Sequence, residues 1–272
     1  MTGFLARTAM IVLLVCLLLA SGWAQTQKEG LALYEEAEEL EAKARTQQDL
    51  EKALEKYQAA VKVFEKTGAE GQKVMARALT RIGSLLYGIG QYEMALERFQ
   101  RVLDIAAKSG DLNGEAEALH DLGMIYSALG KFQSSLETYE KALAACRKAG
   151  NLHGRKGEGD VWNNMGMVYA SMGRHDKALE CFQKDLDVLG QSTDLWARGV
   201  ALTNMAWVYG KQNQHQKALD YYGKALEIHK ERGDLQAQGA VLGKLGEIHK
   251  ALGQCDQALQ CYEKAFEILL KP

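Results

Sequence analysis

Six histidines are the side chains best suited to chemistry in this sequence, and none stands in a pattern that catalysis or metal binding uses. They are His120, His153, His175, His215, His229 and His249. No two have the His-Glu-x-x-His spacing, and His175 and His215, which share one slot forty residues apart, lack the third ligand that a zinc site needs. A Gly-x-Ser-x-Gly turn, which would expose a nucleophilic serine, is also missing from the sequence. The sequence therefore predicts no catalytic residue, no metal and no cofactor.

Four cysteines lie beyond the N-terminal segment, and their spacing argues against disulfides. They are Cys146, Cys181, Cys255 and Cys261. Cys181 and Cys261 occupy equivalent slots of a repeat, and Cys255 and Cys261 are six residues apart on one predicted helix, where they point to different faces. We therefore expect small thiols that are buried or half-buried.

Two glycine-containing motifs have structural explanations. Residues 154–159 resemble a phosphate loop in composition only, because they follow a predicted helix and lack the Gly-Lys-Ser/Thr ending. We expect a mobile hinge there. Arg232-Gly233-Asp234 takes the place that Ser109-Gly110-Asp111 holds in another repeat. This position predicts a glycine that ends one helix and an aspartate that caps the next, rather than a cell-adhesion motif.

The elements that would position these residues follow from a repeat of about 40 residues. A small residue returns at spacings of 40, 43, 40 and 40, as Gly83, Gly123, Gly166, Ala206 and Gly246. An aromatic residue stands sixteen positions after each of them, as Phe99, Tyr139, Phe182, Tyr222 and Tyr262. Glycine within a helix costs about 0.5–1 kcal/mol relative to alanine. Its return therefore predicts a close approach between two helices in each repeat.

Composition agrees with a chain that is nearly all helix. Proline occurs once and glycine 27 times, so glycine alone separates the helices, with Asn213 in the same role once. The 33 basic and 35 acidic residues interleave along the predicted helices without forming like-charge blocks. This pattern predicts no nucleic-acid partner.

The register of small and aromatic residues is similar to the tetratricopeptide repeat, in the longer 40-residue form frequent in bacteria. The resemblance covers Leu122-Gly123, Tyr126, Gly130-Lys131-Phe132 and their counterparts in the other repeats. It implies an all-α, right-handed α-solenoid of stacked antiparallel helix pairs over residues 25–272. A degenerate pair would cover 31–66, and repeats would follow at about 75–108, 115–148, 158–190, 198–231 and 238–271.

The resemblance also implies where a ligand would bind, because in this family the first helix of each pair lines the concave face. Asn164 and Asn204 would hold the backbone of an extended peptide, since an amide group both donates and accepts hydrogen bonds. Met167 and Trp207 would add an exposed apolar patch. The alternative is that these are ordinary solvated positions, with Trp207 half-buried in the core. The predicted peptide-binding residues are His120, Asp121, Asn163, Asn164, Met167, Thr203, Asn204, Trp207, Lys211 and Lys244.

Two positions depart from the repeat. Asp185 stands where other repeats carry alanine, so we expect a buried carboxyl group that finds a partner or raises its pKa. In the last helix, Leu269 and Leu270 replace the polar His229 and Lys230 of the preceding repeat. A repeat array normally ends on a polar surface, so this helix is expected to meet a partner, another copy, or a further domain of a longer chain.

The N-terminal residues predict export. Arg7 precedes an apolar run from Ala9 to Ala20, which is about a dozen residues and shorter than a spanning helix. Residues 1–24 therefore resemble a secretory signal peptide with cleavage near Ala24, which would place the protein in the periplasm or outside the cell. An uncleaved N-terminal membrane anchor is the alternative.

The predicted function is that of a non-enzymatic scaffold, which binds an extended peptide or a partner protein and acts on no small-molecule substrate. Two alternatives remain at this point. In one, the C-terminal helix joins copies into a homo-oligomer. In the other, the array is the N-terminal regulatory part of a larger multidomain enzyme, as similar arrays often are.

Overall fold

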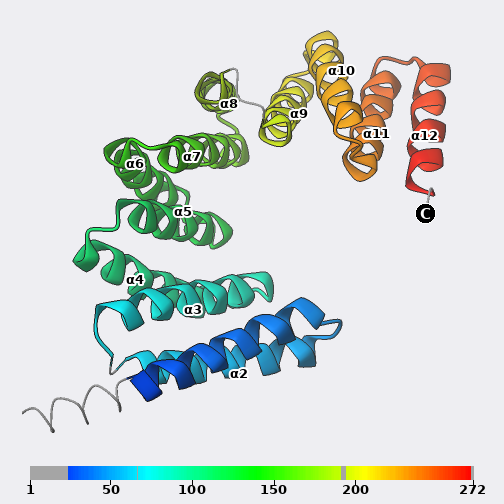
Figure 1. Cartoon of the computed structure of the whole chain (residues 1–272). Helices are drawn as coiled ribbons and strands as arrows, with labels where there is room; N and C mark the ends of the chain where they lie inside the picture. Colours follow the sequence, from blue (N-terminus) through cyan, green and yellow to red (C-terminus); the bar gives the residue numbers. More distant parts are fainter. Residues whose placement is uncertain (1–23, 66, 191–193, 271–272) are drawn as a thin grey trace, which may run out of the picture. The chain divides into compact units, whose positions relative to one another are not determined.

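The computed structural model describes residues 24–65, 67–190 and 194–270, which form twelve helices (Figure 1). The first covers residues 24–43. The others are α2 (Gln47–Phe64), α3 (Ala69–Gly88), α4 (Tyr92–Ser109), α5 (Leu112–Ala128), α6 (Phe132–Ala149), α7 (Leu152–Ser171), α8 (His175–Leu189), α9 (Leu195–Lys211), α10 (His215–Glu231), α11 (Leu235–Ala251) and α12 (Cys255–Leu269). None of the helices within these ranges is long and apolar enough to cross a membrane. The predicted signal peptide lies outside the described residues, apart from Ala24 at its end.

Glycine and aspartate set the boundaries of the helices, as the sequence predicts. Glycines that end helices have positive φ values, and Asn213 adopts this backbone in the turn between α9 and α10, with φ of 58°. Gly233 has φ of 67°, and the Asp234 carboxylate accepts a hydrogen bond from the Ala237 amide at 2.9 Å. Arg232-Gly233-Asp234 is therefore a helix-to-helix turn, as predicted.

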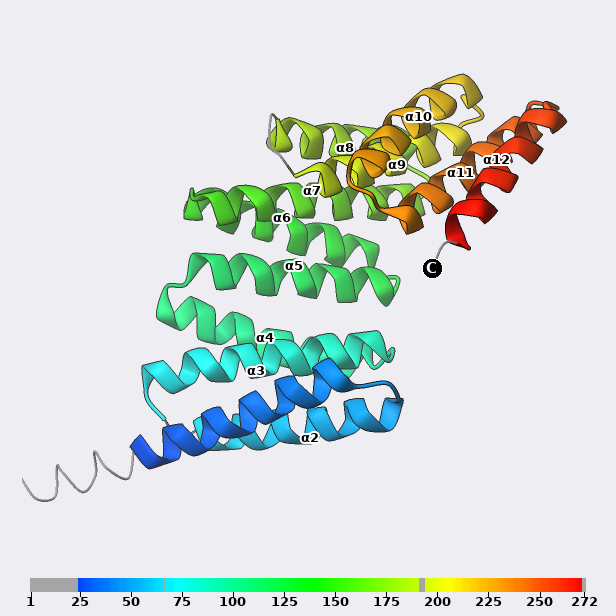
Figure 2. The ribbon, with the colours of Figure 1, turned by 45° about the vertical axis from the view of Figure 1, so that its right-hand side comes forward.

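The chain divides into two compact units, Met1–Leu129 and Gly130–Pro272, here called the N-terminal unit and the C-terminal unit. In the N-terminal unit, the helix over residues 24–43 packs on α2 through Tyr34 and Tyr57, whose rings meet edge to face at 5.5 Å. The helices α2, α3, α4 and α5 then pack each on the next (Figure 2). One hydrophobic core joins all five helices.

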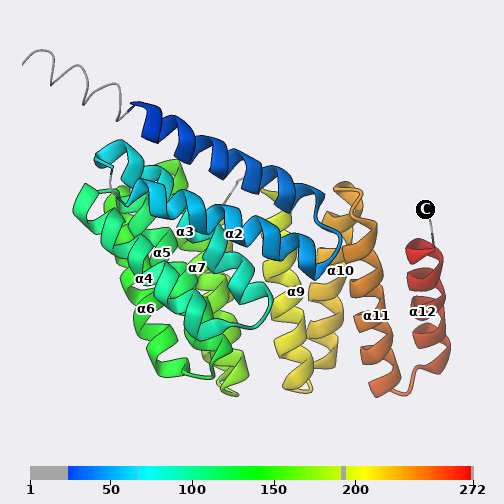
Figure 3. The same cartoon turned by 90° about the horizontal axis from the view of Figure 1, so that it is seen from below.

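In the C-terminal unit, consecutive helices from α6 to α12 also pack in order, and α9 to α12 lie side by side (Figure 3). The helices α7 and α9, which are the first helices of successive repeats, also contact each other directly. A surface built from first helices therefore exists in this unit.

The recurring small residues stand where the sequence predicts a close approach. A Cβ atom added at Gly83 would lie 2.6 Å from the ring of Phe99, one at Gly166 would lie 2.5 Å from Phe182, and one at Gly246 would lie 2.6 Å from Tyr262. These distances are too short for real contacts, so the aromatic ring of each second helix occupies the space that a side chain would need. At Gly83 and Gly166 the helical cost of glycine is offset by the burial of Phe99 and Phe182, whereas Tyr262 of the last helix stays 38% exposed.

The prediction of a hinge over residues 154–159 is wrong, because these residues belong to α7. Asn151 caps the helix by accepting a hydrogen bond from the Gly154 amide at 2.8 Å. Gly154 and Gly159 are buried, and a Cβ atom at Gly154 would lie 2.6 Å from the carbonyl oxygen of Cys146. These glycines therefore allow α7 to pack closely, and packing outweighs their poor helix propensity.

Asp185 of α8 is buried, as predicted, with 3% of its surface exposed. Its Oδ1 atom lies beside Gly159 of α7, where a Cβ atom would come within 2.9 Å. Burial, with smaller contributions from Asp160 and Asp194, raises the pKa of the Asp185 carboxyl group to about 7.

Candidate functional site

Two asparagines from successive first helices form the polar centre of the surface on α7 and α9. The Asn204 Nδ2 group donates a hydrogen bond to Oδ1 of Asn163 at 2.9 Å, and both side chains are half-buried. This bond leaves Oδ1 of Asn204 as an acceptor and the Nδ2 group of Asn163 as a donor. The pair therefore retains both acceptor and donor groups, which together can complement a peptide group.

A cavity of about 180 Å³ opens beside this amide pair, between α9, the end of α10 and the start of α11. Its lining is mostly apolar and includes Trp196, whose surface is 52% exposed. Thr203 and Asn204 supply its polar edge. An exposed tryptophan at the mouth of an apolar cavity is suited to contact with a ligand side chain. The remaining lining residues are Val200, His229, Asp234, Ala237, Ala240 and Val241.

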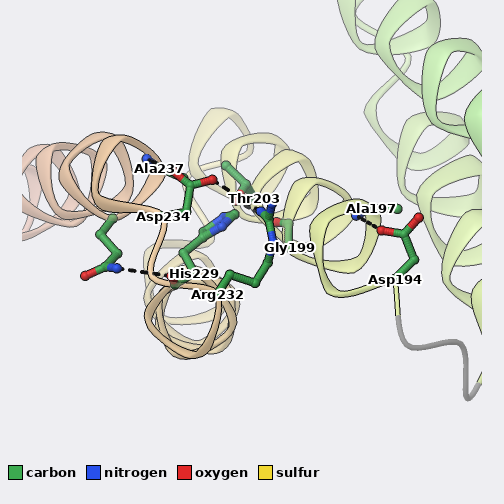
Figure 4. Close-up of polar contacts among 9 residues, drawn as sticks. Asp194, Ala197, Gly199, Thr203, His229, Arg232, Asp234 and Ala237 are labelled. Atoms are coloured by element: carbon green, nitrogen blue, oxygen red, sulfur yellow. Dashed lines mark hydrogen bonds and ion pairs between the residues drawn. The ribbon is translucent and has the colours of Figure 1, made fainter.

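His229 closes one wall of this cavity, and glycine makes room for it. The imidazole is 3% exposed, and a Cβ atom at Gly199 would lie 2.7 Å from its Cε1 atom. Figure 4 shows the ring among Gly199, Arg232 and Asp234, with Nη1 of Arg232 at 3.2 Å from Oδ2 of Asp234. Burial lowers the pKa of the imidazole, while the Asp234 carboxylate opposes this shift. The ring is therefore neutral near pH 7.

The other predicted residues of the C-terminal unit differ in how they relate to the pair of Asn163 and Asn204. Thr203 donates its hydroxyl hydrogen to the Gly199 carbonyl at 2.8 Å, and Met167 is 39% exposed. Trp207 is half-buried against two core clusters, with the Lys211 ammonium 5.5 Å from its ring centroid. Lys244 instead pairs with Glu247 at 2.9 Å on its own helix. Asn164 is half-buried on α7.

His120 and Asp121 belong to the N-terminal unit. Nδ1 of His120 lies 3.3 Å from Oδ1 of Asp121. Asp121 also lines a separate cavity of about 400 Å³ that extends between α3, α4 and α5. The predicted residues therefore divide between two surfaces, one in each unit.

Sequence reasoning missed Trp196, the residue that most clearly marks the cavity of the C-terminal unit. It lies on the same face of α9 as Val200, Thr203 and Trp207, at helical spacings of four, three and four. This spacing could have identified Trp196 from the sequence as part of the same helix face. The register around each small residue covers only the middle of the first helix, whereas Trp196 lies in its first turn.

In the part of the chain that the structure describes, no group of three or more His, Cys, Asp or Glu side chains could hold a metal ion. The four cysteines of these residues are free thiols. The predicted burial is confirmed for Cys146, Cys181 and the half-buried Cys261 but is wrong for Cys255, which is exposed at the start of α12. Burial raises the pKa of the Cys146 thiol and that of the Cys181 thiol to about 11. They are therefore poor nucleophiles at neutral pH.

A family model described as tetratricopeptide repeat matches residues 41–108, 74–148 and 158–231, and a second matches residues 240–268. The chain belongs to the tetratricopeptide repeat family. The predicted all-helical fold of consecutive helix pairs is confirmed. No curated protein matches the sequence.

Solved structures of similar fold come from several kinds of protein. BtubC (BKLC) from P. vanneervenii has a TM-score of 0.70 and 17% identity, over 79% of this chain and 89% of its own. Aspartyl phosphate phosphatase F from Bacillus subtilis has a TM-score of 0.68 and 14% identity, over 95% of this chain and 76% of its own. A Rap protein complexed with Competence and Sporulation Factor has a TM-score of 0.57 and 15% identity, over 88% of this chain and 74% of its own. At these identities the likeness concerns the fold alone.

Proposed function

We propose that this tetratricopeptide repeat protein is a non-enzymatic scaffold that binds an extended segment of another protein on the first helices of its repeats. The observation that carries the proposal is the hydrogen bond between Asn204 and Asn163. The bond orients two amides from successive repeats and leaves a donor and an acceptor for a peptide backbone. The apolar cavity beside Asn204 would receive one side chain of the same segment.

The similar fold of the Rap protein complexed with Competence and Sporulation Factor supports a ligand-binding role for this architecture. It does not identify the ligand of this chain. The surface residues that differ between such proteins decide which segment binds.

Peptides selected from a randomised display library on the purified chain would test this proposal. We expect N163A/N204A to weaken the selected peptides roughly tenfold or more, because each lost hydrogen bond is worth about 0.5–1.5 kcal/mol. Gln216→Ala is the matched control, because Gln216 is exposed on α10 and does not line the cavity. Equal affinity of all three proteins, with unchanged circular dichroism, would contradict a role for the amide pair.

A second candidate function, self-association, is favoured by the exposed face of α12. Leu259, Phe266 and Leu269 are 58%, 65% and 57% exposed, whereas their counterparts on α10, which are Leu219, Leu226 and His229, are half-buried or buried. Large exposed apolar patches commonly mark interaction surfaces. This candidate is compatible with peptide binding on the first helices.

A further inference from the structure

The cavity of the N-terminal unit is a groove with walls of opposite charge. The α3 wall carries Lys73, Arg77 and Arg81, which are four residues apart, exposed and therefore on one face of the helix. The α5 wall carries Glu117 and Asp121 at the same spacing. Each of these acids stands forty residues after one of the arginines, so equivalent slots of successive repeats carry opposite charges. The floor between the walls includes Ala76, Val102, Ile105 and Ala118.

Lys73 and Arg77 of the α3 wall have only weak partners within the chain, whereas Arg81 also makes a hydrogen bond with the Tyr34 side chain and is attracted by the Glu41 carboxylate. The Lys73 ammonium lies 3.4 Å from Glu70, with both side chains exposed, and Nη2 of Arg81 lies 3.9 Å from Glu38. The Arg77 guanidinium lies 5.9 Å from the ring centroid of Tyr34. Exposed pairs of this kind contribute little, because water screens the charges. A carboxylate from a ligand could therefore replace them with shorter, charge-assisted hydrogen bonds.

The spacing of these charges matches the repeat of an extended chain. Four residues of an α-helix rise about 6 Å, and two residues of an extended strand rise about 6.6 Å. Over the three cations, the accumulated difference is only about 1 Å. Side chains of an extended chain alternate between its two sides. Every second residue of a ligand in the groove would therefore face Lys73, Arg77 and Arg81 in turn, and the residues between would face α5.

We propose that this groove binds an extended segment with acidic residues at every second position and basic residues between them. The proposal rests on the proposed function, because it assumes that the first helices form the binding surface. It assigns a ligand chemistry to the N-terminal unit. The acidic residues of the segment pair with Lys73, Arg77 and Arg81, and the basic residues pair with Glu117 and Asp121.

Two capped peptides of identical composition would test the proposed register. One carries Glu-Lys-Glu-Lys-Glu between Gly-Ser ends, and the other carries Glu-Glu-Glu-Lys-Lys between the same ends. Both have the same net charge, so they differ only in the order of charges. Fluorescence anisotropy of labelled peptides on the full chain at low salt should give at least tenfold tighter binding of the alternating peptide. Added salt should weaken this binding, because the charges are exposed.

A pair of double variants locates the binding. K73A/R77A removes two cations from the groove, whereas R101A/K108A removes two cations from α4, outside the lining. We expect the first variant to lose at least tenfold in affinity for the alternating peptide and the second to bind it like the wild type. Because all four side chains lie at the surface or are half-buried, circular dichroism should remain unchanged.

Equal binding of the two peptides would overturn the proposal, since net charge alone would then explain it. Failure of the alternating peptide to bind, or equal losses in both double variants, would also overturn it. These outcomes leave the proposed function standing, because the amide pair of Asn163 and Asn204 lies in the other unit and is tested by library selection. Conversely, a negative result in the library selection would not decide whether the charged groove binds the alternating peptide. The anisotropy titration decides that separately.

Discussion

Asp185 is a carboxyl group in a helix interface where the equivalent residues Ala142 and Ala225 are fully buried. The groups that face it are Gly159 and Asp160 on α7 and Asp194 at the start of α9, with the Lys156 ammonium 3.9 Å from Asp194. No cation pairs with Asp185 directly in the hydrogen bonds and ion pairs of the described residues. Its raised pKa therefore reflects burial first and neighbouring negative charge second.

The raised pKa of Asp185 predicts that the free energy of unfolding of the chain falls as pH rises. The folded chain keeps the Asp185 proton up to a pKa of about 7, whereas the unfolded chain releases it near 4. Folding therefore takes up a proton between these values, and ionisation above pH 7 opposes the folded state. We expect D185N to become more stable relative to the wild type as pH rises from 5 to 8, by about 2–3 kcal/mol, because about two pH units of the linkage fall in this range. Urea unfolding at several pH values measures this difference.

Asp187→Asn is the matched control for that measurement. Asp187 lies on the same helix, but it is exposed and accepts a hydrogen bond from Gln183 at 2.9 Å. The difference in unfolding free energy between D187N and the wild type should stay nearly constant over the same pH range. If the difference in unfolding free energy between D185N and the wild type is also constant over this range, the carboxyl group of Asp185 is ionised in the folded chain and its assigned pKa is wrong.

At the scale of helices, the sequence predicts most of what the structure contains, because side-chain volume sets the contacts. The ring of Phe99 occupies the space that a side chain at position 83 would need, so the two residues recur together at a fixed spacing in the sequence. The turn at Asn213 was equally predictable from its left-handed preference.

The features that escaped prediction depend on contacts between segments. Gly154 and Gly159 suggested a hinge from local propensity, yet they lie in α7 because neighbouring helices approach them closely. The sequence placed Asn163 and Asn204 on the same kind of surface. It could not show that they bond to each other, since that depends on how α7 and α9 lie together.

The exposed face of α12 predicts a dimer. Leu259, Tyr262, Phe266 and Leu269 follow one another at spacings of three, four and three, which is symmetric, so the same stripe of an antiparallel copy would match it. Tyr262 and Leu269 also pack on Gly246 and Gly239 of α11, so a dimer would bury their remaining exposed parts together with Leu259 and Phe266. We therefore expect sedimentation of a dimer at tens of micromolar, and of a monomer for L259E/F266E.

Q257E/Q260E is the control for the dimer, because it adds two carboxylates to exposed positions of α12 outside the stripe. It should sediment like the wild type. A wild-type chain that remains monomeric at the same concentration would exclude self-association through this helix.

At the scale of the whole chain, the proposed export has to be compatible with free thiols. Cys146 and Cys181 are buried, with the pKa of each thiol raised to about 11, so only about one in ten thousand is ionised at pH 7. Cys255 is exposed, and Cys261 is half-buried. An oxidising compartment would therefore leave the two buried thiols unreactive without any disulfide.

Export predicts that the chain isolated from a bacterial host lacks its first 24 or so residues, because the apolar run Ala9–Ala20 is long enough for a signal peptide and too short to span a membrane. Intact mass measures this directly. Replacing Leu13 and Leu14 by aspartate should abolish processing and keep the full-length mass. A wild-type chain of full-length mass in the membrane fraction would favour the uncleaved anchor, and one in the cytoplasmic fraction would contradict export altogether.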